Sequence, residues 1–129
     1  MLKLEKKEII GISALLIHAA KIDEIYSEKE KKIILNFIKN NNNDKNMIKE
    51  ILDEAEKLEN NSNQLLNYTK IIKDSPLKTK SEIIEQLWRI LISDGSIDLY
   101  ESNLMRRICG LIYFSDKECG EIKMRLLKS

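Results

Sequence analysis

The sequence predicts an all-α fold, a compact single domain of about seven helices that covers residues 1–129. Three observations predict it. The chain has one proline and four glycines among 129 residues, which leaves few turn residues for a many-stranded protein. Apolar residues recur at three- and four-residue intervals along most of the chain, which is the period of a helix with one buried face. Serine or aspartate followed three residues later by glutamate marks several expected helix starts, a spacing typical of a capping box.

The first helix is expected over about residues 4–21, where apolar side chains cover much more than one stripe and therefore require burial on most sides. Ser27 and Glu30 then form a capping box that opens the second helix. The run of asparagines at 40–43 ends this second helix. Asp44 is expected to cap a third helix, whose apolar residues lie on one face.

A polar turn is expected at residues 59–63, followed by a short fourth helix with the apolar residues Leu65, Leu66, Tyr68, Ile71 and Ile72. Pro76 and the two residues before it end that helix, because the residue preceding a proline avoids the helical region. The fifth helix, around residues 83–92, is nearly as apolar on all sides as the first.

Two more capping boxes predict the last helices. Asp98 with Glu101 opens the sixth helix, and Ser115 with Glu118 opens the seventh. The seventh helix is expected to bury its apolar residues Ile122, Met124, Leu126 and Leu127.

A short acidic pattern occurs twice and indicates an internal repeat. Asp23 and Glu30 in the first copy lie 71 positions before Asp94 and Glu101 in the second. The same offset aligns apolar residues of the preceding helices, Ile12 with Ile83 and Leu16 with Leu87. The sequence therefore predicts two helix-loop-helix units related by duplication.

The members of this pattern differ in how well local structure explains them. Glu30 and Glu101 are placed at the third position of a helix, where capping alone justifies a carboxylate. Asp23 and Asp94 follow the carboxyl end of a buried helix, where a negative charge is poorly placed for stability. The two aspartates therefore carry the hypothesis of a binding site.

The second copy also matches the carboxyl half of an EF-hand loop, with Asp98 as an additional acidic position. A complete EF-hand requires oxygen ligands at loop positions one and three, and here these are Ile90 and Ile92. A complete EF-hand is therefore excluded. Carboxylates at fixed spacing still suit a hard cation, Ca²⁺ or Mg²⁺ rather than zinc or copper.

Two blocks of sequence carry a resemblance to a known family. Residues 19–30 (Ala-Ala-Lys-Ile-Asp through Glu30) and residues 92–101 (Ile-Ser-Asp-Gly-Ser-Ile-Asp through Glu101) each close an apolar helix and open another. In this the chain resembles the TerB family of tellurite-resistance proteins and their TerB-like relatives. Glu24 stands where the family more usually has glycine, so the second copy is the better match.

The resemblance implies a seven-helix fold, a cytoplasmic role in the response to tellurite and other chemical stress, and a divalent-metal site on the repeated acidic positions. Carried onto this chain, that site comprises Asp23, Glu30, Asp94 and Glu101, with Asp98 added. We expect weak binding, with Ca²⁺ favoured over Mg²⁺. The alternative is a metal-independent module that binds protein partners in a stress-response assembly. An interpretation equal in weight to binding, and not exclusive of it, is that the acidic pattern is a pair of capping motifs preserved from the duplication. A third and weaker option is hydrolysis by a carboxylate-bound metal, for which the chain supplies no evident base or nucleophile.

Several function classes are not favoured. A formal net charge of +1 gives no overall field to attract nucleic acid or anionic lipid, and no apolar run is long enough to span a membrane. No catalytic triad, phosphate loop or dinucleotide motif appears, so an enzyme is not expected. Cys109 and Cys119 are expected as free thiols in a reducing cytoplasm, with neither a zinc site nor a nucleophile indicated. His18 is expected to be a satisfied structural histidine rather than a ligand.

Overall fold

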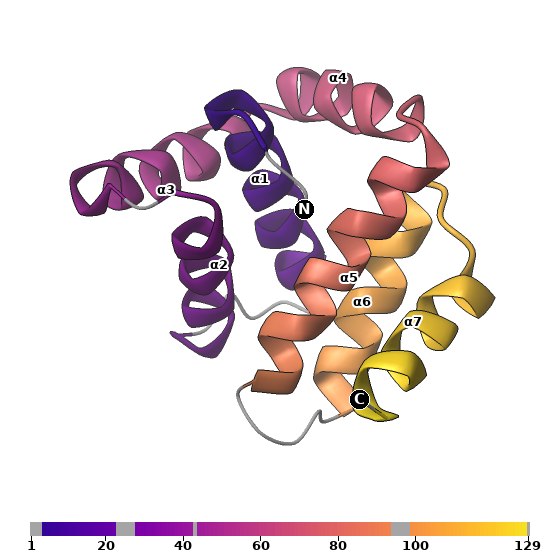
Figure 1. Cartoon of the computed structure of the whole chain (residues 1–129). Coiled ribbons are helices and arrows are strands. Elements are labelled where there is room, and N and C mark those ends of the chain that lie inside the picture. Colours follow the sequence, from indigo (N-terminus) through magenta and orange to yellow (C-terminus); the bar gives the residue numbers. More distant parts are fainter. Residues whose placement is uncertain (1–3, 23–27, 43, 94–98, 129) are drawn as a thin grey trace. The chain divides into compact units, whose positions relative to one another are not determined.

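A computed structural model describes residues 4–22, 28–42, 44–93 and 99–128. Within these ranges the chain forms α-helices and no strands (Figure 1). The helices are α1 (Lys6–Ile22), α2 (Glu28–Asn41), α3 (Lys45–Asn60), α4 (Ser62–Lys73), α5 (Leu77–Ser93), α6 (Leu99–Leu111) and α7 (Asp116–Lys128). The prediction of an all-α fold with about seven helices is confirmed.

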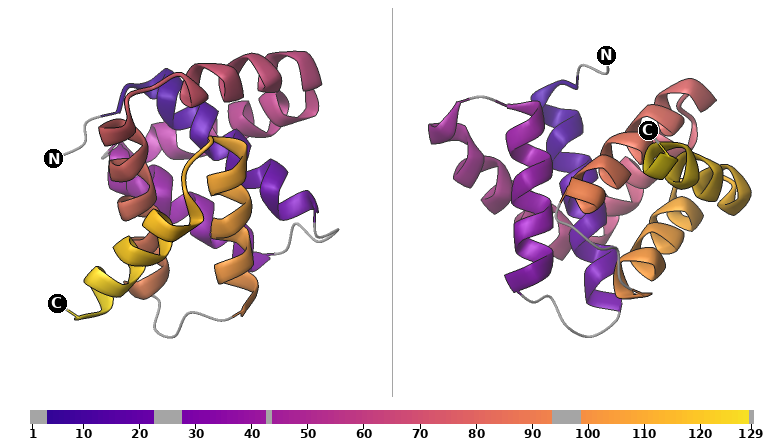
Figure 2. Two further views of the ribbon diagram at one scale, coloured as in Figure 1. Left: turned by 90° about the vertical axis from the view of Figure 1, so that its right-hand side faces the viewer. Right: turned by 60° about the horizontal axis from the view of Figure 1, so that its bottom comes forward.

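The chain divides into two compact units, and the division falls within α4, between Thr69 and Lys70. In the first unit α1 packs against α2 and α3, and α2 packs against α3. In the second unit α5, α6 and α7 contact one another in the same three pairings. Each unit is therefore a three-helix bundle, and Figure 2 shows both from two further directions.

The helix boundaries repeat with the spacing found in the sequence. Adding 71 to the residue numbers that bound α1 gives the bounds of α5. Adding 71 to the first residues of α2 and α3 gives the first residues of α6 and α7. The repeat unit therefore contains three helices, one more than the helix-loop-helix pair that the acidic pattern predicts.

The first helix of each unit is buried on most sides, as predicted. In α1 every residue from Ile9 to Ala20 except His18 is buried. In α5 the buried residues are Lys80, Ile83, Ile84, Leu87, Trp88, Ile90 and Leu91. These apolar stripes are wide because each helix contacts both of the other helices in its unit.

Side-chain caps fix the start of the third helix in both units. Asp44 caps α3, since its carboxylate accepts a hydrogen bond from the backbone N–H of Asn46 at 3.0 Å. Ser115 occupies the equivalent position before α7, and its hydroxyl accepts from the backbone N–H of Glu118 at 3.3 Å. Both predicted caps are confirmed. Ser27 and Asp98, predicted to cap α2 and α6, lie outside the described residues.

The turn before the third helix is built differently in the two units. In the first unit, Asn41 Nδ2 donates to the carbonyl of Phe37 at 2.8 Å, and Asn42 Oδ1 accepts from the N–H of Asp44 at 2.9 Å. In the second unit, Tyr113 has a φ of 58°. The N–H of Phe114 bonds the carbonyl of Cys109 at 2.8 Å, which completes a Schellman-type end to α6.

The first part of α4 is held against α1 by close packing. A β-carbon built at Gly11, in the middle of α1, would overlap the aromatic ring of Tyr68. Glycine costs about 1 kcal/mol in a helix relative to alanine. It is required here because the ring takes the space of a side chain.

Three details differ from the sequence prediction. The polar turn at 59–63 is a single non-helical residue, Asn61, whose side chain caps α4 by accepting from the N–H of Gln64 at 3.1 Å. Leu66 and Ile71 are 66% and 59% exposed, because α4 buries the face with Leu65, Thr69 and Ile72 instead. In α7 the buried residues are Cys119 and Ile122, whereas Met124 and Leu127 are exposed.

None of the helices in the described ranges has the length and apolar character needed to cross a membrane.

Candidate functional site

The acidic repeat occupies the same helical register in both units. Asp23 is the residue directly after the last residue of α1, and Asp94 directly follows the last residue of α5. Glu30 is the third residue of α2, and Glu101 is the third residue of α6. The pattern therefore begins at the end of the first helix of each unit and closes in the first turn of the second.

Of the five predicted site residues, the structure describes the side chain of Glu101 alone. Asp23, Asp94 and Asp98 lie outside the described residues, and Glu30 is described only in its backbone. Elsewhere, in the part of the chain that is described, no group of three or more histidine, cysteine or acidic residues is placed to hold a metal ion.

Glu101 is a buried carboxyl group, with 3% of the residue exposed. Burying a charge costs free energy unless other groups compensate it. The first turn of a helix offers unpaired backbone N–H groups and the positive end of the helix dipole. The position of Glu101 at the third residue of α6 therefore gives a local structural reason for an acidic side chain there.

In the first unit, a charged cluster joins α1 to the end of α3. The carboxylate of Glu59, whose side chain is 9% exposed, lies 2.6 Å from Lys21 Nζ and 3.2 Å from His18 Nδ1. Burial by itself would raise the pKa of Glu59, but the hydrogen bonds and positive charges of Lys21 and His18 outweigh it and lower the pKa below 4.5. His18 therefore has a structural partner, as predicted.

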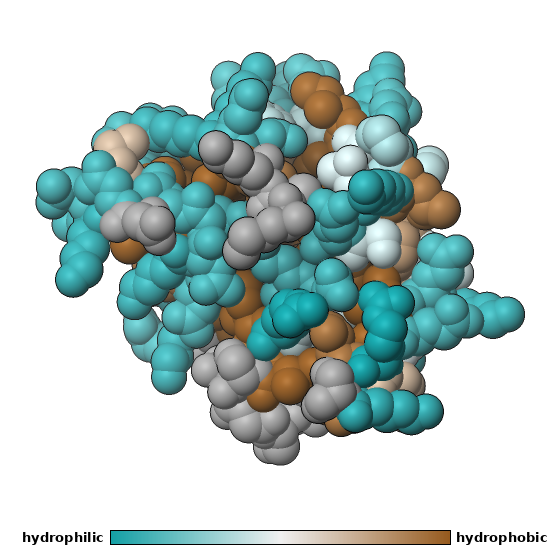
Figure 3. Space-filling model, in the orientation of Figure 1, coloured by the Kyte–Doolittle hydropathy of each residue, from teal (hydrophilic) through white to brown (hydrophobic). Residues whose placement is uncertain are grey.

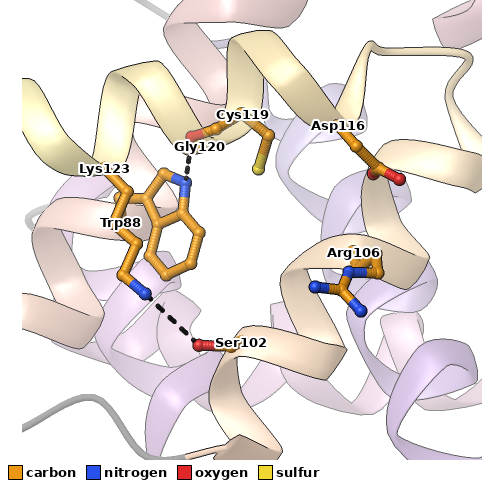
Figure 4. Close-up of a pocket in the computed structure, with 7 residues that line it drawn as sticks. All are labelled: Trp88, Ser102, Arg106, Asp116, Cys119, Gly120 and Lys123. Atoms are coloured by element: carbon orange, nitrogen blue, oxygen red, sulfur yellow. Dashed lines mark hydrogen bonds between the residues drawn. The ribbon is translucent and has the colours of Figure 1, made fainter.

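In the second unit, a pocket of about 140 Å³ lies where α5, α6 and α7 meet (Figure 4). Its lining combines an aromatic ring, two cations, an acid and a thiol. The lining residues are Trp88, Ser102, Arg106, Asp116, Cys119, Gly120 and Lys123.

Trp88 and Lys123 define one wall of this pocket. The indole Nε1–H donates to the backbone carbonyl of Cys119 at 3.1 Å, so the polar atom of this buried side chain is satisfied. Lys123 Nζ lies 5.3 Å from the centre of the indole ring and 3.5 Å from the hydroxyl of Ser102. The amine thus makes a cation–π contact with Trp88 while it lines the pocket.

The first unit has a groove at the repeat-equivalent position. Its lining residues are Leu35, Lys39, Asn42, Lys45, Ile48, Lys49 and Leu52. Five of these lie 71 positions before pocket residues of the second unit, which are Arg106, Asp116, Cys119, Gly120 and Lys123. Duplication has therefore produced two versions of one surface feature, apolar with a lysine rim in the first unit and polar with a thiol in the second.

Sequence reasoning did not find this pocket. The available signal was the 71-residue offset itself: applied to α3 and α7, it pairs Ile48 with Cys119 and Leu52 with Lys123. A change from apolar to reactive or charged residues at equivalent positions marks where the two units differ chemically.

Comparison with known proteins gives one family. The family model described as "Tellurite resistance protein TerB" matches residues 10–124, from α1 to α7. No curated protein and no solved structure matches the chain. Because the match covers well over half of the chain and includes both three-helix units, this chain belongs to the TerB family.

Proposed function

We propose that this TerB-family protein acts in a tellurite-resistance type of stress response by weakly binding a divalent cation, Ca²⁺ in preference to Mg²⁺. The cation binds through Asp94, Asp98 and Glu101 in the second unit, and Asp23 and Glu30 in the first unit form a related or shared site. The role is binding rather than catalysis, and the compartment is the cytoplasm. One observation carries the proposal: in each unit an aspartate follows the first helix and a glutamate closes the pattern at the third residue of the second.

The donor set fits a hard cation. All five side chains supply carboxylate oxygens, which Ca²⁺ and Mg²⁺ prefer over softer ligands. Asp23 and Asp94 follow helix ends, where the helix dipole disfavours a negative charge, and a bound cation would remove that cost. Few protein ligands imply weak affinity, with a dissociation constant of about 10⁻⁴ to 10⁻³ M.

Isothermal titration calorimetry with Ca²⁺ tests the proposal. The wild-type chain should release or absorb heat that saturates in the millimolar range, and Asp94→Asn should weaken the binding. Asp53→Asn, at an exposed position of α3, is a matched control that should bind as the wild type does. The absence of heat in the wild type, or equal binding by Asp94→Asn, contradicts the proposal.

A comparison of the single variants Asp23→Asn and Asp94→Asn tests whether the two copies of the acidic pattern act as one site. If they share an ion, each substitution alone reduces the binding of a single Ca²⁺. If they act separately, each removes one of two binding events. Growth of the source cells on tellurite, with the wild-type gene replaced by Asp94→Asn, links binding to the stress response: resistance should fall with the loss of binding.

A second candidate function, a metal-independent interaction module, is favoured by the groove between α2 and α3. Leu35, Ile48 and Leu52 form a half-buried apolar floor, and Lys39, Lys45 and Lys49 surround it. The face over α2 and α3 in Figure 3 is largely hydrophilic. An apolar floor with a basic rim fits an amphipathic helix with acidic flanks.

Fluorescence anisotropy with a synthetic helical peptide of leucine and glutamate tests this candidate. Binding should weaken with salt and with Lys45→Glu or Lys49→Glu, and it should persist in a chelator. Lys57→Glu, an exposed lysine of α3 that does not line the groove, serves as the control. This function of the groove is ruled out if the peptide binds only in the presence of Ca²⁺, or if Lys45→Glu and Lys49→Glu leave the affinity for the peptide unchanged.

A further inference from the structure

The two cysteines of the chain lie on opposite sides of one tight turn in the second unit. Cys109 is in the last turn of α6 and is fully buried, and Cys119 is the fourth residue of α7 and is 5% exposed. The Schellman-type end of α6, with its bond from Phe114 N–H to the carbonyl of Cys109, fixes the turn between them. Both side chains are thiols in this structure.

The two thiols interact and differ in character. The side chains of Cys109 and Cys119 interact, and this interaction raises the pKa of Cys109 and lowers the pKa of Cys119. The charge of Lys123 also lowers the pKa of Cys119, whereas burial and the charge of Asp116 oppose the shift. Cys119 is therefore the thiol that more readily loses its proton.

Access from solvent also distinguishes the two. Cys119 and Trp88 both line the pocket shown in Figure 4. Cys109 is not among the lining residues. The volume of about 140 Å³ admits a molecule several times the size of a water. A small reagent that enters the pocket therefore meets Cys119, whereas Cys109 does not line the pocket and is fully buried.

The internal repeat shows that packing alone does not require cysteine at these positions. The 71-residue offset pairs Cys109 with Ile38 and Cys119 with Ile48. Ile38 is fully buried in the first unit, so the same fold accepts an aliphatic side chain there. Two interacting thiols at positions where the other unit has isoleucines are therefore not explained by packing alone.

We propose that Cys119 and Cys109 form a reversible, peroxide-sensitive dithiol, in which Cys119 reacts with the oxidant and Cys109 then forms a disulfide with the oxidised Cys119. The Cys119 thiolate attacks a terminal oxygen of a hydroperoxide, the O–O bond breaks, and the alcohol or water leaves after taking up a proton. Cys119 is then a sulfenic acid.

The second step closes the disulfide. The sulfur of Cys109 attacks the sulfur of Cys119, the S–O bond breaks, and the hydroxyl leaves as water with the Cys109 proton. Two thiols lose two electrons in total, and the hydroperoxide gains them. A dithiol reductant reverses the change and is itself oxidised to a disulfide.

The chain is suited to a direct test because it contains two cysteines and one tryptophan. The full chain is treated with hydrogen peroxide, unfolded, alkylated and weighed by mass spectrometry. We expect the loss of both alkylatable thiols, with a mass lower by two hydrogens and no covalent dimer. Emission from Trp88 should change as the disulfide forms and return with dithiothreitol, because the indole is bonded to the backbone of Cys119.

Single substitutions test the assigned roles. Cys109→Ala should stop at a sulfenic acid on Cys119 that dimedone traps, and Cys119→Ala should give no dimedone adduct. Asp94→Asn should oxidise as the wild type does, since this chemistry does not depend on cation binding. Two alkylatable thiols remaining in the treated wild type, disulfide-linked dimers in place of the internal bond, or a dimedone adduct on Cys109 would overturn the proposal.

Discussion

The indole Nε1–H of Trp88 in α5 donates a hydrogen bond to the backbone carbonyl oxygen of Cys119 in α7, across 3.1 Å. Trp88 is 2% exposed, so this bond satisfies the polar atom of a large side chain in the core of the second unit. It also fixes the first turn of α7 against α5. The repeat-equivalent residue in the first unit is Ile17, which has no such donor.

Trp88→Phe tests this bond. The substitution keeps an aromatic ring in the core but removes the donor and part of the volume, and we expect a loss of about 1–3 kcal/mol in the free energy of unfolding. Urea unfolding followed by circular dichroism measures it. A free energy equal to that of the wild type would show that the bond contributes nothing to stability.

Gly11→Ala is expected to destabilise the chain, against the usual trend for a glycine within a helix. The new β-carbon overlaps the ring of Tyr68, so the cost should be about 1–3 kcal/mol. Gly120→Ala is the matched control: nothing lies within 4 Å of a β-carbon there, and a gain of up to about 1 kcal/mol is expected. Thermal unfolding of both variants should therefore shift in opposite directions.

The Glu59 cluster predicts a pH dependence of stability. The pKa of Glu59 is lower in the folded chain than its ordinary value of 4.5. At pH values below 4.5 the unfolded chain therefore binds more protons at this residue than the folded chain does. The stabilisation that the ionised Glu59 carboxylate gives to the folded chain is fully present above pH 4.5, and it is lost as the pH falls through the pKa of Glu59 in the folded chain. Glu59→Gln should therefore be less stable than the wild type at pH 6, with the difference shrinking under acidic conditions.

Urea unfolding at a series of pH values from 3 to 6 measures this difference. Asp53→Asn, on the exposed face of the same helix, is the control and should follow the wild type more closely. A wild-type advantage over Glu59→Gln that stayed constant through this range would contradict the lowered pKa.

Removal of the side-chain cap of α3 and removal of that of α7 should lower the free energy of unfolding by similar amounts. Asp44→Ala and Ser115→Ala each remove the acceptor for a backbone N–H in the first turn, and each should cost about 1 kcal/mol. Denaturant midpoints give both values. A cost for one variant and none for the other would show that the repeat preserves helix boundaries without preserving how they are stabilised.

Much of the fold follows from the sequence because helix periodicity and capping are local. The caps at Asp44 and Ser115, the end of α2 at the asparagine run and the end of α4 before Pro76 are all read from neighbouring residues. Which face of α4 or α7 is buried depends on tertiary contacts, so the exposure of Leu66 and Met124 is not visible in their spacing.

In the candidate sites, too, the local features were predictable from the sequence and the contacts between helices were not. The register of the acidic pattern against the helices was predictable, since both its ends lie at helix boundaries. The approach of Glu59 to His18, and of Cys109 to Cys119, was not, because each joins residues from different helices. The repeat offset was the available long-range signal, and extending it to the third helix pairs the cysteines with isoleucines.

The proposed function depends on cation binding by the acidic repeat. Nuclear magnetic resonance of the ¹⁵N-labelled chain during titration with Ca²⁺ tests it most directly, because it reports which residues respond. We expect saturable chemical-shift changes concentrated in residues 23–30 and 94–101, and the loss of these changes from the second segment in Asp94→Asn. Shifts spread evenly over the exposed carboxylates, or none in these two segments, would contradict it.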